Sequence, residues 1–380
     1  MRKLTILILL SALALPAFSE KHETAERITV AQLEQAIAAA HGSPDAQVAQ
    51  QISGLGLSER LSAARLARLE ADLPGPQAQH ALTVLADVAE FLNLPAADTP
   101  STPPPSHAQQ TALMALTREF VVKTLTKLPN FFATRETTRF EGTPAQSMAS
   151  SGSVAKYGQL HEVGNSSVAV LYRDNQEWMD QGKTRKASLK ELRTMGEFGP
   201  ILATLLNDVA KGTVLWSHWE QGEPGPLAVF HYAVPEQASH YRVASVGAMR
   251  ETQRDPAYHG EIAINPADGS ILRLTMVAEL KPDNPMTDAS LLVDYGPVEF
   301  GGVTYICPVR SLALSLVRVV VEQVDDRGPR VMPERSSLGP PQAYLNVVQF
   351  TQYHLFRADT RILAGDSQEP AAAPAGIVPK

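Results

Sequence analysis

Apolar residues recur at helical spacing near the start of the chain and alternate with polar residues along many short segments after it. Over residues 28–93 the pattern predicts four short amphipathic helices separated by Gly, Pro and Ser. Thr29 and Gln32 form a capping-box pattern at the start of the first helix, ahead of Leu33 and Ile37. Helices this short bury little apolar surface individually, so we expect them to pack on one another as a small helical array.

The third of these helices is predicted to begin at Ser58. Its leucines recur on one side, whereas Arg60, Arg65 and Arg68 fall on the other side and are expected to face solvent. Isolated charges on such helix faces, Glu34 among them, are most simply interpreted as solvated.

A region dominated by strand-like segments begins at residue 111. It contains two helical stretches, one ended by Pro129 and one opened by a capping-box pattern of Ser188 and Glu191. The strands are joined by short turns such as Asn265–Gly269, in which Gly supplies a positive φ. Consecutive strands with few helices between them predict an antiparallel sheet with those helices on one face, and therefore an α+β fold.

The segment Ile271–Leu280 carries the clearest strand pattern. Polar Arg273, Thr275 and Glu279 occupy one set of alternate positions. The other set is apolar: Leu272, Leu274, Met276, Ala278 and Leu280. Because successive side chains of a strand point to opposite faces, we expect one face of this strand to line an apolar interior and the other to face water.

The first residues carry the pattern of a secretory signal. Arg2 and Lys3 precede an apolar run over residues 4–15, and the small residues that end at Ser19 place cleavage before Glu20. An N-terminal membrane anchor is the alternative, but the run is short for a transmembrane span. We therefore expect an exported protein, periplasmic or secreted, with no transmembrane segment in the mature chain.

Shifts in composition divide the chain into five parts. The predicted parts are a signal peptide at 1–19, a helical module at 20–93, a Pro-rich linker at 94–110, a sheet-forming domain at 111–362 and a disordered tail at 363–380. The 380 residues include 33 Lys and Arg against 40 Asp and Glu, for a net charge of −7. This balance argues against a dedicated nucleic-acid-binding protein, because basic residues do not predominate.

Three stretches resemble a set of uncharacterised exported bacterial proteins. They are 128–137 (LPNFFATRET), 196–202 (GEFGPIL) and 294–309 (DYGPVEFGGVTYICPV). The succession of strands over 128–320 also resembles the periplasmic lipoprotein-carrier fold. That resemblance implies a curved antiparallel half-barrel over 111–362, with helices packed on its inner face, that shelters acyl chains. The additional helical module and linker depart from the minimal carrier pattern.

Motifs with an established chemistry are scarce in the sequence. His161 and Glu162 begin a zinc-protease pattern, but the second histidine is missing, so no metal site is predicted. The sequence has no phosphate-binding loop, nucleophile elbow or spaced Cys and His set, and we predict no cofactor and no catalytic residue. Cys307, the one cysteine, lies in an apolar run and is interpreted as a buried small hydrophobe, with a reactive thiol as the alternative.

The segment 216–220 is the densest polar and aromatic cluster. On a regular strand Trp216, His218 and Glu220 share one face and Trp219 takes the other. A His beside a carboxylate could act as a general base, whereas the simpler interpretation is a sheet position with a hydrogen-bonded His on the wet face. His259, next to Tyr258, poses the same question.

These observations favour a noncatalytic exported protein that binds a hydrophobic ligand, a lipid or a lipoprotein acyl chain, in the groove of the half-barrel. The candidate ligand-binding residues are Leu272, Leu274, Met276, Trp216 and Phe230. The alternative is a cell-envelope interaction or scaffold module that binds a protein partner through the N-terminal helices. A hydrolase that uses His218 or His259 is a third hypothesis.

Overall fold

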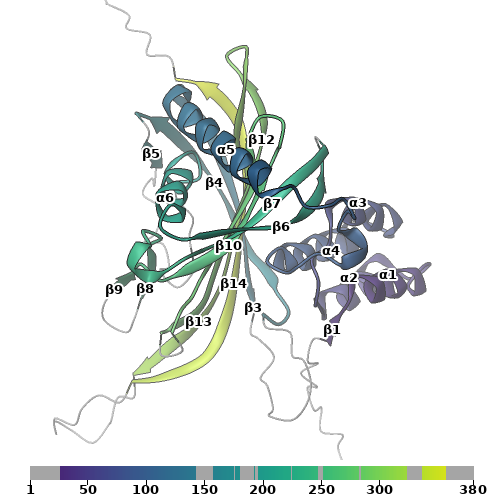
Figure 1. The fold of residues 1–380 in the computed structure, drawn as a ribbon. Helices are drawn as coiled ribbons and strands as arrows, with labels where there is room; N and C mark the ends of the chain where they lie inside the picture. Colours follow the sequence, from purple (N-terminus) through teal and green to yellow (C-terminus); the bar gives the residue numbers. More distant parts are fainter. Residues whose placement is uncertain are drawn as a thin grey trace, which may run out of the picture.

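The computed structural model describes residues 26–142, 157–174, 176–179, 192, 196–223, 225–246, 251–281, 284–322 and 336–356. These residues form a curved, unclosed antiparallel sheet with helices on both of its faces (Figure 1). The expected α+β class and half-barrel are therefore confirmed. The predicted signal peptide at 1–19, the tail at 363–380 and the capping box of Ser188 and Glu191 lie outside the described residues.

Four helices and a two-stranded parallel sheet make up the part that we call the helical module. Its elements are β1 (Glu26–Ile28), α1 (Val30–Ala39), α2 (Asp45–Ser53), β2 (Leu55–Leu57), α3 (Ala63–Asp72) and α4 (Pro76–Ala89). The predicted capping box of Thr29 and Gln32 opens α1, with Thr29 Oγ1 accepting from the Gln32 N–H at 3.2 Å. Leu33 and Leu82 are buried in an apolar core that the four helices share, as the helical spacing predicts.

The third helix differs from its prediction. It begins at Ala63 rather than at Ser58, whose N–H and hydroxyl instead bond to the Ile28 carbonyl. Arg60 then lies ahead of the helix, and it is 3% exposed rather than solvated. The helical periodicity placed Arg60 wrongly because the residue does not belong to a helix.

The large sheet contains ten strands in the order β5-β4-β3-β14-β13-β12-β11-β10-β7-β6. The strands are β3 (Phe131–Gly142), β4 (His161–Arg173), β5 (Gln176–Met179), β6 (Thr213–Gly222), β7 (Gly225–Val234), β10 (Tyr258–Ile264), β11 (Ile271–Ala278), β12 (Met286–Phe300), β13 (Val303–Glu322) and β14 (Ser336–Leu355). A hairpin of β8 (Val243–Val246) and β9 (Glu251–Arg254) stands apart from it. Every pairing in the large sheet is antiparallel, which short connections between successive strands favour.

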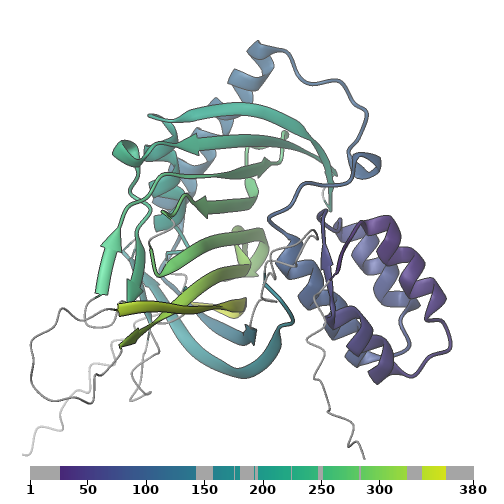
Figure 2. The same ribbon diagram turned by 90° about the horizontal axis from the view of Figure 1, so that it is seen from below.

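Two further helices, α5 (His107–Lys127) and α6 (Pro200–Val209), lie on the concave face of the sheet, and the helical module lies against the convex face (Figure 2). Two short 3₁₀ turns, η1 (Ala96–Asp98) and η2 (Glu236–Ala238), interrupt the connections. Among the described residues, no helix is long and apolar enough to cross a membrane. Cys307 is a free thiol, buried in the aromatic core of the concave face, as predicted.

Candidate functional site

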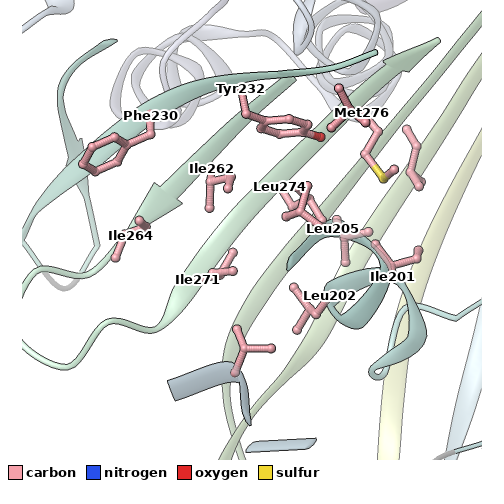
Figure 3. Close-up of a cluster of buried hydrophobic side chains, with 14 of the residues drawn as sticks. Ile201, Leu202, Leu205, Phe230, Tyr232, Ile262, Ile264, Ile271, Leu274 and Met276 are labelled. Carbon is pink, nitrogen blue, oxygen red and sulfur yellow. The ribbon is translucent and has the colours of Figure 1, made fainter. Parts of the chain in front are cut away.

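The concave face of the sheet is largely covered by α6. Ile201, Leu202 and Leu205 of this helix pack on an apolar surface formed by β7, β10, β11 and β12 (Figure 3). Leu205 and Leu274 are both 0% exposed. This part of the half-barrel is therefore a packed protein core.

Helix α5 covers the same face with much less contact. Of its described side chains two are buried, Thr117 and Val121, although the helix is 21 residues long. The β10–β11 turn contacts the middle of α5 at Gly269, which has φ +77°. The approach is close, because a Cβ atom on residue 269 would lie 2.7 Å from the Leu116 backbone. Helix α5 therefore lies over the concave face but packs on it through few buried side chains.

A groove of about 830 Å³ separates α5 from α6, and we call it the concave groove. Its apolar walls come from three elements and its floor from Phe230 of β7. The apolar lining consists of Met114, Val122, Leu206, Val209, Val214 and Phe230. Arg118, Glu119 and Lys123 of α5 contribute charge at its rim. The volume lies within the range of about 300–1,000 Å³ that is typical of small-molecule sites.

One of the predicted ligand-binding residues lines this groove, and a second packs behind it. Phe230 lines it directly, and Trp216 of β6 packs edge-on against Phe230 with ring centroids 5.4 Å apart. Leu274 and Met276 lie on the same face, but α6 covers them at 0% and 1% exposure.

The fifth predicted residue, Leu272, is on the wrong face for this groove. The β10–β11 pairing shifts register next to Ile264, so Ile271 takes the concave position. Leu272 packs instead with Leu227, Val229 and Ala263 on the convex face. Strict alternation failed here because a bulge adds a residue to one strand and reverses the faces beyond it.

A second bulge corrects the expected arrangement of the 216–220 cluster. The β6–β7 register shifts between Trp216 and His218, and Trp219 therefore joins Trp216 on the concave side with ring centroids 5.0 Å apart. His218 and Glu220 lie on the convex side, 3.6 Å apart. The His218 ring also lies 2.9 Å from the Ser217 hydroxyl.

Glu220 is the centre of an ion cluster between the helical module and the sheet, which we call the Glu220 latch. Its carboxylate receives Arg60 at 2.5 Å and Arg273 at 2.6 and 2.7 Å. Burial acts to raise the pKa of Glu220, but hydrogen bonds and charge from Arg273, His218 and Arg60 outweigh it and hold that pKa well below its ordinary value. The carboxylate beside His218 is therefore already neutralised by two arginines.

A buried carboxylate pair, which the sequence reasoning missed, lies under the start of α6. Glu177 accepts the N–H groups of Gly196 and Phe198 at 2.9 and 2.7 Å, and Glu197 accepts Arg135 at 3.0 Å. Burial and the neighbouring Glu197 raise the pKa of Glu177 to about 7. These contacts anchor the turn that leads into α6 on the concave face. Across the ranges that the structure describes, no group of His, Cys, Asp and Glu could hold a metal ion.

Comparisons with known proteins find similarity in structure alone. No family model matches the chain, and no curated protein matches its sequence. A LolA superfamily protein from Nitrosomonas europaea is 9% identical, with a TM-score of 0.27, and the match covers 64% of this chain and 94% of that chain. A DUF1329 family protein from Desulfovibrio piger is 7% identical, with a TM-score of 0.28 and coverage of 64% and 92%. The chain is similar to these two proteins at a level on which no functional argument rests.

Proposed function

We propose that this is an exported, noncatalytic protein that binds a hydrophobic ligand, a lipid or a lipoprotein acyl chain, in the concave groove. The observation that carries the proposal is the groove of about 830 Å³ between α5 and α6, which reaches the aromatic floor at Phe230. Removing apolar surface from water would drive binding, at about 25 cal/mol per Å² before the cost of association.

The weak attachment of α5 supports this choice of site. A ligand in the groove would contact α5, and any displacement of this helix would uncover two buried described side chains. Val122 lies on the groove side of α5 and is 55% exposed. An apolar chain in the groove would cover this side chain, whereas α6 and the residues beneath it would stay packed.

The test compares two substitutions that each place a carboxylate on an exposed apolar residue. Val122→Glu puts the charge into the groove, and Leu215→Glu puts it on β6, where Leu215 is 64% exposed and outside the groove. The full chain is purified from a bacterial periplasm without detergent and examined by native mass spectrometry and lipid extraction. We expect a near one-to-one apolar ligand in the wild type and in Leu215→Glu, and its loss in Val122→Glu.

Two outcomes would overturn the proposal. One is a wild-type protein that carries no ligand and does not bind added lipid. The other is equal ligand occupancy in the Val122→Glu and Leu215→Glu proteins. Trp216, which packs on Phe230, gives a second readout, since a ligand on the groove floor should change its fluorescence. The exposed Trp178 is replaced by Phe to lower the background.

A further inference from the structure

A second cavity lies on the other side of the sheet, where the helical module meets the convex face. We call it the interface cavity, and its volume is about 710 Å³. The helical module contributes β1, α2, β2 and α4, and the sheet side contributes β3, β10, β11, β12 and the segment 157–162. It is separate from the concave groove, since the two share no lining residue among those described.

The walls of the interface cavity are apolar on both sides. Val84 and Val88 of α4 follow one another at one helical turn, and both also touch the buried cluster around Phe140 on the sheet. Opposite the module lie the sheet-side residues Phe140, Leu160 and Val277. The apolar side of helix α4 that carries Val84 and Val88 therefore contacts the sheet along part of its length, and the rest of this side faces the interface cavity.

Two ion clusters fix the helical module in place across the same interface. The Glu220 latch joins Arg60 to the sheet, and Arg310 of β13 pairs with Asp87 of α4 and with Asp294 of β12 at 3.0 Å. These side chains are largely buried, with Arg60 4% and Asp87 4% exposed. The two sides of the cavity are therefore held together by specific contacts.

The rim of the cavity carries one arginine, three histidines and one carboxylate. Arg27, His80, His161 and His259 line it, together with Glu162. His80 Nε2 lies 4.0 Å from Glu162 Oε2, so that acid already has a basic neighbour. Among the side chains that the structure describes, Glu26 not being one of them, no carboxylate lies within ion-pair distance of Arg27, which is exposed at the rim.

The remaining acid near the inner wall is already satisfied. Asp288 accepts the Tyr157 hydroxyl at 2.6 Å and the Ser290 hydroxyl at 3.0 Å. An apolar cavity with a guanidinium at its mouth and its acids already engaged is complementary to a molecule with an apolar chain and an anionic head.

We propose that the interface cavity is a second binding site, which takes a single-chain amphiphile with an anionic head. The chain lies between α4 and the convex face, and the head group pairs with Arg27. A free fatty acid and a single-chain anionic phospholipid share this chemistry. This second site is separate from the concave groove, and the proposal does not depend on ligand binding there.

The test uses the full chain with Val122→Glu, so that ligand in the concave groove does not contribute. Palmitate, its uncharged methyl ester and a single-chain phosphatidylglycerol are titrated by calorimetry, and native mass spectrometry counts the bound molecules. We expect one palmitate to bind and the methyl ester to bind about fivefold more weakly, since an ion pair at an exposed guanidinium contributes up to about 1 kcal/mol. Tighter binding of the phospholipid than of palmitate identifies a lipid head group as the source, and the reverse order identifies a free fatty acid.

Three substitutions locate the bound molecule. Arg27→Gln should weaken palmitate binding about fivefold, whereas Arg173→Gln, the same change at an exposed residue that pairs with Asp174, should leave binding unchanged. Val84→Glu should abolish binding by placing a charge on the apolar wall. Arg27 is exposed, so its variant is expected to fold even if Val84→Glu does not.

The proposal is overturned if palmitate fails to bind in the Val122→Glu protein, or if Arg27→Gln and Arg173→Gln bind it equally. Equal affinities for palmitate and the methyl ester would overturn the part of the proposal that assigns an anionic head group to the ligand. Failure of the concave groove has a different signature, namely equal occupancy by the native ligand in the Val122→Glu and Leu215→Glu proteins.

Discussion

Replacing Glu220 by Gln tests whether buried charge holds the helical module on the sheet. The side chains of Arg60, Glu220 and Arg273 are 4%, 13% and 12% exposed, so the substitution leaves two largely buried guanidinium groups without their carboxylate. Removing one partner of a buried ion pair costs about 3–5 kcal/mol. We expect Glu220→Gln to lower the free energy of unfolding by about that amount at pH 7.

Glu34, which is more exposed than Glu220, provides a matched control for this substitution. Glu34 also contacts two arginines, Arg65 at 2.7 Å and Arg68 at 2.5 Å, but Glu34 is 29% and Arg68 60% exposed. Exposed ion pairs contribute about 0–1 kcal/mol. Glu34→Gln should therefore lower the free energy of unfolding by no more than about 1 kcal/mol.

Urea denaturation followed by tryptophan fluorescence measures both variants. Trp219 reports on the interface, because it lies on the same strand as Glu220 and its Nε1 donates to the Pro103 carbonyl at 2.9 Å. The pKa of Glu220 is lowered in the folded state, so its stabilisation is complete above the unfolded value of about 4.3 and is lost as the pH falls further. Equal losses in Glu220→Gln and Glu34→Gln at pH 7 would refute the reasoning.

Three further predictions follow from burial. Burial raises the pKa of Asp87 to about 7, so the stability that this carboxyl group contributes is complete below about pH 4 and is lost as the pH rises through 7. Asp87→Asn should therefore show a smaller fall in Tm between pH 5 and pH 8 than the wild type. An identical fall in Tm would contradict this expectation. Leu274→Ala should lower the free energy of unfolding, measured by urea denaturation, by about 2–5 kcal/mol. Leu272→Ala should lower it clearly less, because Leu274 is 0% exposed and Leu272 is half-buried on the convex face. Equal losses would mean that both residues lie in one core. Burial raises the pKa of Cys307 to about 12, so maleimide should label it only at the rate of unfolding, and rapid labelling of the native protein would disprove its burial.

The apolar pattern predicted most of the elements because each depends on local chemistry. The capping box of Thr29 and Gln32 starts α1, and the Asn265–Gly269 turn joins β10 to β11, with the Gly269 N–H donating to the Asn265 carbonyl at 2.9 Å. Both features are specified within five residues, so distant parts of the chain are not needed to predict them.

The alternation of apolar and polar residues predicted less well which face of the sheet a residue occupies. Leu272 and Trp219 were each placed on the wrong face, since bulges in the β10–β11 and β6–β7 pairs reverse the alternation. A bulge depends on how two strands pair, and the alternation of one strand does not reveal it. Arg60 was predicted to face solvent for a similar reason, because its partner Glu220 is 160 residues away.

The candidate sites depended still more on tertiary structure. Phe230 and Trp216 were predicted from the sheet, but the groove beside them exists because α5 and α6 lie apart on the concave face. The interface cavity was not predicted at all, because its walls come from the helical module and from strands that begin beyond residue 130 of the chain.

By itself the sequence determined the α+β class, the helices of the helical module, the antiparallel strands and the burial of Cys307. These follow from residue periodicity, capping and turn chemistry, which act over short stretches of chain. The tertiary structure alone decided that the module packs on the convex face, that α6 packs on the inner face of the half-barrel, and that the concave groove and the interface cavity remain between the packed elements. The physical reason is that a cavity is the space which packed elements leave between them, and its shape depends on contacts between residues that are distant in sequence.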